Sequence, residues 1–167
     1  MNSLSKNHWN DDLKVSRKRH KENEVLLKCS NPSSITLPTG TAVGSVFTVS
    51  AVTINASRFS NPCIKLEFTS NIITTAAVLT LNFQIFKLYR NQFTPRPIGP
   101  IWTLSRSVAT TDANTFTFFI CDCDCCSDDC CTYSVVATVA GAPTVGVTAI
   151  NNSLLSALVV ENNCHCC

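Results

Sequence analysis

Alternation of apolar and polar residues at every second position is the feature that most limits how this chain can fold. In the segment Val-Leu-Thr-Leu-Asn-Phe-Gln-Ile at 78–85, Leu79, Leu81, Phe83 and Ile85 share one parity and the polar residues take the other. Successive side chains of a β-strand point to opposite faces, so this pattern predicts a strand with one buried face. The segment therefore indicates β structure.

Other segments show the same pattern. Ile-Lys-Leu-Glu-Phe-Thr at 64–69 alternates equally well and follows Asn61-Pro62, which is a turn signal. Beyond Ile85 the alternation changes phase and puts Phe86 and Leu88 on the parity opposite to Lys87, as a β-bulge does when it re-aims side chains. Weaker strand candidates are residues 34–37, 45–54, 101–108, 115–121, 132–139, 144–150 and 154–160.

Turn signals separate these candidate strands at Pro38-Thr-Gly40, at 95–100, at Asp112-Ala-Asn114 and at Gly141-Ala-Pro143. Short strands at regular spacing with such turns are typical of β-sandwiches, and the chain has no βαβ pattern. We therefore predict an all-β fold, a jelly-roll or Greek-key β-sandwich.

Charge divides the chain into two parts. Residues 1–28 contain seven of the thirteen Lys and Arg residues, including the cluster Arg17-Lys-Arg-His-Lys21, and lack apolar periodicity until Val25, Leu26 and Leu27. We predict a basic, flexible amino-terminal connector arm at 1–28 that ends in this apolar patch. Residues 29–167 form the predicted sandwich body, with a cysteine-rich hairpin and a carboxyl-terminal cysteine tail. The chain has 167 residues, of which 45% are hydrophobic and 14% charged, enough for one core and one domain.

The sequence also carries expectations about compartment. No stretch of about 20 apolar residues exists, so we expect no membrane-spanning helix and no membrane partner. Residues 1–28 lack the apolar h-region of a secretion signal, so synthesis in a reducing cytosol is expected. That expectation conflicts with a cysteine-rich composition, because stable disulfides are rare in the cytosol.

Cysteine is the residue type most relevant to function. The chain has eleven cysteines, and an odd number cannot all pair within one molecule. Flanking carboxylates at 122, 124, 128 and 129 make the central run polar, so burial of all its cysteines as small apolar residues is disfavoured. If the strand at 116–120 continues, Cys121, Cys123 and Cys125 project from one face, followed by a loop from 125 to 131. The candidates for disulfides within or between subunits are Cys29, Cys63, Cys121, Cys123, Cys125, Cys126, Cys130, Cys131, Cys164, Cys166 and Cys167.

Metal binding is an alternative use of these thiols. Cys-x-Cys and Cys-Cys steps with the Cys-His-Cys-Cys ending at 164–167 could ligate zinc or copper, but paired Cys-x-x-Cys knuckles at zinc-finger spacing are absent. A redox-enzyme role needs a thiol at a helix start in a βαβ context, which the body lacks. Disulfide cross-linking is the favoured interpretation, with no metal and no cofactor.

Enzyme and nucleic-acid functions find little support. The three histidines are His8 and His20 in the arm and His165 in the cysteine tail, so no catalytic unit has a rigid base. The basic cluster at 17–21 has no interleaved aromatic platform for bases, and only Trp9 lies nearby. We expect neither an active site nor a nucleic-acid partner.

Several stretches within 29–152 carry a resemblance to a little-characterised family of endospore-forming Clostridia. They are Asn61–Phe68, Ala76–Phe83, Phe116–Phe119 with the following Cys-Asp-Cys-Asp-Cys run, and Cys131–Thr138. The combination of a β body, an amino-terminal arm and cysteine pairs is also similar to the subunits of Bacillus-type endospore appendages.

This resemblance implies a fold and a function. Appendage subunits are jelly rolls that stack into pilus-like fibres, and their amino-terminal connectors carry cysteines that bridge to subunits further along. Val25-Leu-Leu-Lys-Cys29 occupies the matching place, although it has the single thiol of Cys29 where the appendage connector has a Cys-Cys pair and a further Cys. The resemblance implies a partner for Cys29 within 121–131 or 164–167.

The expected function is that of a structural subunit that self-assembles head to tail into a disulfide-crosslinked helical filament. Its partner is itself, with other spore-surface proteins as further candidates, and Val25, Leu26 and Leu27 are the expected connector contacts. The expected location is the endospore surface, reached without secretion when the mother cell lyses, which also explains oxidation of the thiols. The alternative is a thiolate module of the spore coat that holds zinc or copper.

Overall fold

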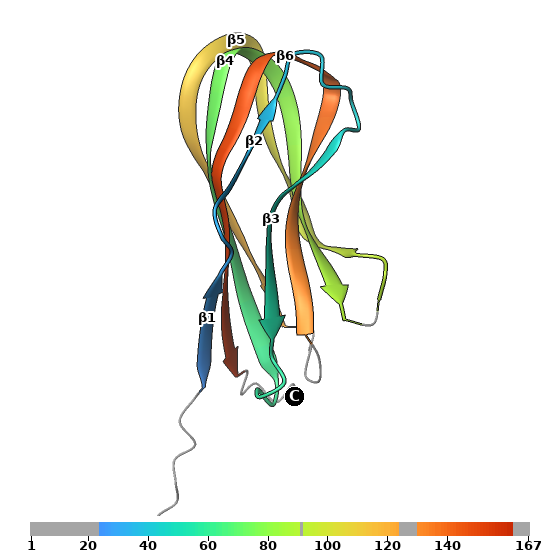
Figure 1. Cartoon of the computed structure of the whole chain (residues 1–167), viewed down its shortest axis with the longest axis vertical. Helices are drawn as coiled ribbons and strands as arrows, with labels where there is room; N and C mark the ends of the chain where they lie inside the picture. The colour runs from blue at the N-terminus through green and yellow to red at the C-terminus, as the bar shows by residue number, and fades with distance from the viewer. Residues whose placement is uncertain (1–23, 91, 124–129, 162–167) are drawn as a thin grey trace, which may run out of the picture.

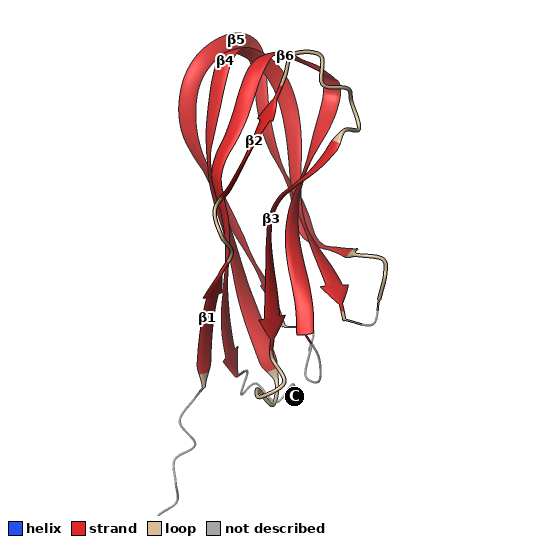
Figure 2. Cartoon of the chain, in the orientation of Figure 1, coloured by secondary structure: helices blue, strands red, loops and turns tan. Residues whose placement is uncertain are grey.

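The computed structural model describes residues 24–90, 92–123 and 130–161. The secondary structure of this part consists of strands (Figures 1 and 2). They are β1 (Val25–Cys29), β2 (Ser33–Leu37), β3 (Val46–Asn55), β4 (Pro62–Tyr89), β5 (Arg96–Asp122) and β6 (Cys130–Glu161). Within these described ranges, no helix is long and apolar enough to cross a membrane.

The long strand β6 organises the sheet. Along one side it pairs in turn with β3, β2 and β1, and along the other side it pairs with β4, whose far side pairs with β5. All of these pairings are antiparallel. In the strand order β1-β6-β4-β5, the edge strands are therefore β1 and β5.

The sheet folds over on itself because β4, β5 and β6 bend near their middles, at the upper end of the molecule in Figure 1. At this bend Ala76 and Gly146 have positive φ values of 46° and 69°, and the register between β4 and β6 shifts between Thr75 and Val78. The two halves of β4 then face each other, as the 5.9 Å separation of the Phe68 and Phe83 ring centroids shows.

The fold-over produces two packed layers. The first contains β1 and β2, then the second half of β6, the first half of β4 and the second half of β5. The second contains β3, then the first half of β6, the second half of β4 and the first half of β5. This arrangement is a jelly roll, so the predicted fold class is confirmed.

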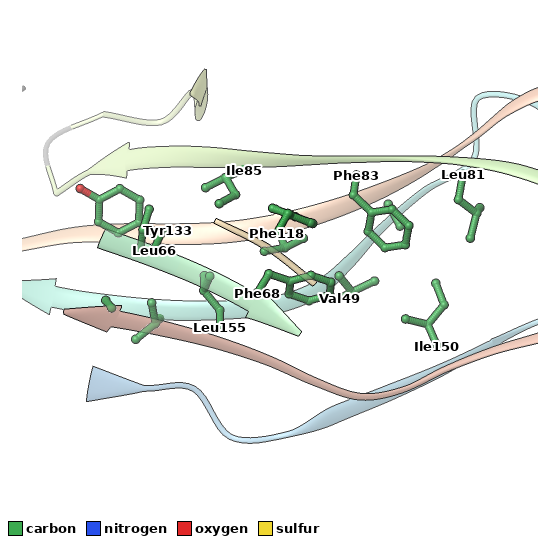
Figure 3. Packing of buried hydrophobic residues seen from close by; sticks show 14 of the residues in the cluster. Val49, Leu66, Phe68, Leu81, Phe83, Ile85, Phe118, Tyr133, Ile150 and Leu155 are labelled. Atoms are coloured by element: carbon green, nitrogen blue, oxygen red, sulfur yellow. The ribbon is translucent and has the colours of Figure 1, made fainter. Parts of the chain in front are cut away.

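The core fills the space between the layers (Figure 3). Residues of the predicted alternating segments are buried as expected: Leu79, Leu81, Phe83 and Ile85 from the second half of β4, and Ile64, Leu66 and Phe68 from the first half. Aromatic rings from β5 join them, and Trp102 stacks on Phe118 across the layers with centroids 4.1 Å apart. Burial of these side chains is the main source of stability.

Several expectations about strand boundaries were wrong. The predicted turns at 112–114 and 141–143 lie inside β5 and β6, because the chain bends there without leaving the sheet. Short strands predicted on either side of each turn are therefore halves of one long strand. The predicted phase change after Ile85 is also wrong: Lys87 is buried on the core face, and Phe86 and Leu88 are half-buried on the other. An irregularity does occur nearby, between Phe83 and Ile85 in the register with β5.

The amino-terminal boundary also differs from the expected one. β1 begins at Val25, so the sheet of the body includes the last residues of the range 1–28 that was assigned to the arm. Pairing of Val25 with Val160 and of Leu27 with Leu158 fixes this strand on β6 of the same chain. Residues 1–23, with the basic cluster at 17–21, lie outside the described residues.

Candidate functional site at the cysteine-rich end of the sandwich

The outward face of the first layer carries the predicted site residues in cross-strand rows. Directly opposite residues in antiparallel strands project to the same face. One row runs from Val25 through Val160 to Cys63. The next runs from Leu27 through Leu158 and Lys65 to Cys121, and the one after it from Cys29 through Ser156 and Glu67 to Phe119.

These rows create an exposed apolar patch on β1 and β6, formed by Val25, Leu27, Leu158 and Val160. Val25 is 57% exposed and Leu27 is 67% exposed, whereas Leu26, on the opposite parity, packs against the core. The predicted connector contacts thus divide: Val25 and Leu27 face outward, and Leu26 faces inward.

Three described cysteines are free thiols: Cys29 and Cys121, which are exposed, and Cys130, which is half-buried. Cys29 ends β1 and Cys121 lies on β5, so the two exposed thiols lie at opposite edges of the first layer. Both project from the same outward face. No other sulfur in the described ranges is both exposed and free.

Cys63 and Cys123 form a disulfide within the chain. The pairing of Ile64 with Asp122 in the β4–β5 register brings these two sulfurs opposite each other at the end of the layer. Cys131 is fully buried and is disulfide-bonded as well. Some of the eleven cysteines are thus used within one molecule, which the odd count left open.

The remaining candidates, Cys125, Cys126, Cys164, Cys166 and Cys167, lie outside the described residues, as does His165. In the part that the structure describes, no three His, Cys, Asp or Glu side chains come together to hold a metal ion. The metal-binding alternative, which depends largely on the undescribed cysteines, stays a prediction.

A buried polar cluster lies at the same end, on the inward side of the layers. The Nζ atom of Lys87 is 2.7 Å from Oδ2 of Asp122, with side-chain exposures of 4% and 8%. The hydroxyl of Tyr133 donates a hydrogen bond of 2.8 Å to the same Oδ2. Burial, followed by the Asp122 carboxylate, raises the pKa of the Tyr133 hydroxyl far above its ordinary value, so this hydroxyl is protonated in its resting state.

Sequence reasoning missed this cluster and treated Asp122 only as one of the carboxylates that make the cysteine run polar. A signal was present, because Lys87 keeps the parity of Leu81, Phe83 and Ile85, and Asp122 keeps that of Phe116, Phe118 and Ile120. A charged residue at the end of an inward-facing run points into the core as long as the strand continues. The strand does continue to both residues.

Comparison with models of protein families assigns the chain to one family. The family model described as "Domain of unknown function (DUF4489)" matches residues 23–160, a span that starts just before β1 and ends in the last residues of β6. The chain belongs to the DUF4489 family. The matched span of this DUF4489 chain contains both exposed thiols, the Cys63–Cys123 disulfide and the buried polar cluster.

No curated protein matches the DUF4489 chain. Among solved structures, the infectious bursal disease virus Gx strain is similar at 13% identity and a TM-score of 0.49, over 86% of this chain and 34% of that chain. The Gt strain of that virus gives 11% identity and a TM-score of 0.49, over 85% and 38%. Eiger TNF from S. frugiperda gives 6% identity and a TM-score of 0.49, over 83% and 92%. The chain spans just over a third of the length of the two viral chains, and similarity at this level carries no inference about function.

Proposed function

We propose that this chain is a structural subunit that self-assembles head to tail into disulfide-crosslinked extracellular fibres on the endospore surface. The observation that supports this most is the position of Cys29 and Cys121, two exposed free thiols on one outward face at opposite edges of one layer. A molecule with a reactive group at each of two different edges can link to a copy on both sides.

The open edges favour a directional contact. β1 and β5 end the strand order, and both expose backbone groups that a neighbouring strand could pair with. The successive antiparallel pairings make β5 antiparallel to β1. β5 of one copy against β1 of the next would therefore continue an antiparallel sheet. Because the two edges differ, the contact is heterologous and continues as a helical filament unless its rotation closes.

The apolar patch of Val25, Leu27, Leu158 and Val160 adds a driving force beside the β1 edge. Apolar surface covered by a second copy is removed from water, at roughly 25 cal/mol per Å². We propose that β1 serves as the docking edge while it stays paired with its own β6. This replaces the simpler expectation that Val25, Leu26 and Leu27 all cross to another subunit.

Oxidation would lock the contact. In the proposed fibre, Cys29 of one copy and Cys121 of the next form a disulfide, and their two thiols give two electrons and two protons to molecular oxygen. Release by lysis of the mother cell would supply that oxidant without a secretion step. The endospore location and the fibre form rest on the resemblance to endospore proteins.

The experiment compares oxidised wild-type protein with single cysteine variants. On non-reducing gels, air-oxidised wild type should give a ladder of covalent oligomers that collapses with strong reductant, and electron microscopy should show filaments. Cys29→Ser and Cys121→Ser should each abolish the ladder, whereas Cys130→Ser, which changes the half-buried free thiol, should retain it. Monomers of the wild type at high concentration under oxidation would contradict the proposal.

Truncation can test the arm separately. Removing residues 1–23 retains β1, whereas removing residues 1–28 would also delete most of that strand and confuse loss of the arm with damage to the sheet. Circular dichroism checks that the body is folded.

Elemental analysis distinguishes the fibre from the metal-binding alternative, which requires stoichiometric zinc or copper and thiols that react only after a chelator has removed the metal.

A further inference from the structure

Two inward-facing apolar runs end in opposite charges at the same end of the sandwich. On β4 the run is followed by Lys87, and on β5 it is followed by Asp122. Lys87 belongs to the second layer and Asp122 to the first, so their contact joins the two layers. The apolar residues of these runs are Leu81, Phe83 and Ile85 on β4, and Phe116, Phe118 and Ile120 on β5.

The two charged groups touch in a place with little water. Nζ of Lys87 lies 2.7 Å from Oδ2 of Asp122, and the side chains are 4% and 8% exposed. Lys and Asp are rarely buried to this degree, because removal of both charges from water is expensive even for a close pair. The amine nitrogen of Lys87 therefore lies directly next to the carboxyl group of Asp122. Because both side chains are buried, little water competes for this contact.

Tyr133 supplies a proton donor at the reacting carboxyl group. Its hydroxyl donates to Oδ2 of Asp122 at 2.8 Å, and its ring lies under the Lys87 ammonium, with Nζ 5.7 Å from the ring centroid. The ring of Tyr89 lies on the same ammonium at 4.9 Å. Figure 3 shows the Tyr133 hydroxyl at one end of the buried cluster, beyond the apolar side chains.

We propose that Lys87 and Asp122 condense into an amide, an isopeptide bond that joins β4 of the second layer to β5 of the first. A proton passes from Nζ to Oδ2, and both groups become neutral. The nitrogen lone pair then attacks Cγ of Asp122 and forms the C–N bond. Tyr133 gives its proton to Oδ2 as the C–O bond breaks, and it takes a proton back from the nitrogen. One amine and one carboxylic acid thus yield one secondary amide and one water molecule, and no oxidant is consumed.

The geometry favours this reaction over the persistence of two separate side chains. Groups that are held in contact react with effective concentrations far above those in solution, because the entropy of bringing them together has already been lost in folding. A positioned proton donor at the leaving oxygen accelerates such a step further. The Cys63–Cys123 disulfide helps, since it ties the residue after Asp122 to β4.

The test is the intact mass of the purified, folded full-length chain after complete disulfide reduction. We expect a mass lower than that of the sequence by one water molecule. Tandem mass spectrometry of a protease digest should identify a branched peptide that links Lys87 to Asp122. Wild-type protein that is folded by circular dichroism and has the full sequence mass would overturn the proposal.

Lys87→Arg is the matched control, because a guanidinium keeps the charge beside Asp122 but is a poor nucleophile. This variant should be folded and have its full sequence mass. Loss of water in Lys87→Arg as well would place the reaction elsewhere in the chain and overturn the assignment. Tyr133→Phe keeps the ring and removes the proton donor, so the dehydrated form should accumulate about 10²-fold more slowly. An unchanged rate in this variant would remove Tyr133 from the mechanism and contradict the step as written.

Discussion

Gly146 lies where β6 bends past β4, and the backbone there leaves no room for a side chain. Its φ is +69°, a region that L-residues other than glycine rarely adopt. A Cβ atom at this position would lie 2.5 Å from the carbonyl oxygen of Thr75 and closer still to that of Ala76. Two strands can therefore bend side by side only because one of them has a glycine at the crossing.

Gly146→Ala should destabilise the fold by about 3 kcal/mol, the combined cost of the strained backbone and of a clash with main-chain atoms that cannot rotate away. Gly44→Ala is the matched control, since φ is +83° there and nothing lies within 4 Å of the added methyl group. We expect a loss of only about 1 kcal/mol for the control. Urea unfolding measures both, and equal losses would show that the close packing at the bend contributes nothing.

Asp112 makes the stability depend on pH. The hydroxyl of Thr74 donates a 2.7 Å hydrogen bond to its Oδ1, and Nη2 of Arg106 lies 3.4 Å from its Oδ2. Chiefly through the Thr74 hydrogen bond, these contacts hold the pKa of the Asp112 carboxyl below the ordinary 3.8, although desolvation opposes them. A carboxyl whose pKa is lower in the folded state contributes stability above the unfolded pKa and loses that contribution as the pH falls through the folded pKa.

Asp112→Asn should therefore be less stable than wild type at about pH 6, and the difference should shrink when the pH is lowered to about 3. The measurement is the urea midpoint of both proteins across this range. Thr74→Val, which removes the hydrogen-bond donor, should also make the urea midpoint less dependent on pH than it is in wild type. A difference between wild type and Asp112→Asn that is constant with pH would rule out this carboxylate as its source.

For the strands, alternation predicted which faces are buried but not which segments are continuous. Residues 64–69 and 78–85 read as two strands, and both belong to β4. The buried parity changes from even positions before the bend to odd positions after it, from Ile72 and Thr74 to Ala77 and Leu79. A bend and a turn both interrupt the alternation and both use small or positive-φ residues, so the sequence pattern cannot separate them.

The candidate site, too, was predicted only in part. The cysteine run was visible in the sequence, but the pairing of Cys63 with Cys123 was not, because it depends on the register between β4 and β5. That register is set by the whole length of two strands. In the same way, Lys87 and Asp122 lie 35 positions apart in sequence and meet only once the layers are stacked.

The Cys63–Cys123 disulfide should stabilise the junction of β4 and β5, because it closes a loop with a sequence separation of 60. Replacing both cysteines by serine should lower the free energy of unfolding by about 2–4 kcal/mol under oxidising conditions. Cys121→Ser, which changes an exposed free thiol two positions from Cys123, should alter it by no more than about 0.5 kcal/mol. With reductant present, the double variant and wild type should have nearly equal free energies of unfolding. If the double variant stays less stable in reductant, the serine side chains and not the missing disulfide cause the loss.

Most strand pairings in the fold need the last strand of the chain. β6 pairs with β1, β2, β3 and β4, so the first three strands have no other sheet partner in the described part. Contacts between segments so far apart in sequence are typical of slow-folding β proteins. The regular spacing of turns in the sequence predicted a sandwich, but the central place of β6 follows from topology and could not be read from any local pattern.

A chain that ends at residue 129, before β6, should therefore fail to fold. It would leave β1, β2 and β3 unpaired and would expose the inner edge of β4, which is a template for aggregation. We expect it to lack cooperative thermal unfolding and the dispersed amide signals of a folded β protein in NMR spectra. Co-expression with a separate fragment that begins at residue 130 should restore both signals, because the strand can then pair in trans. If the fragment that ends at 129 unfolds cooperatively alone, the sheet has a stable subset that does not need β6, and the central role of β6 in folding is wrong.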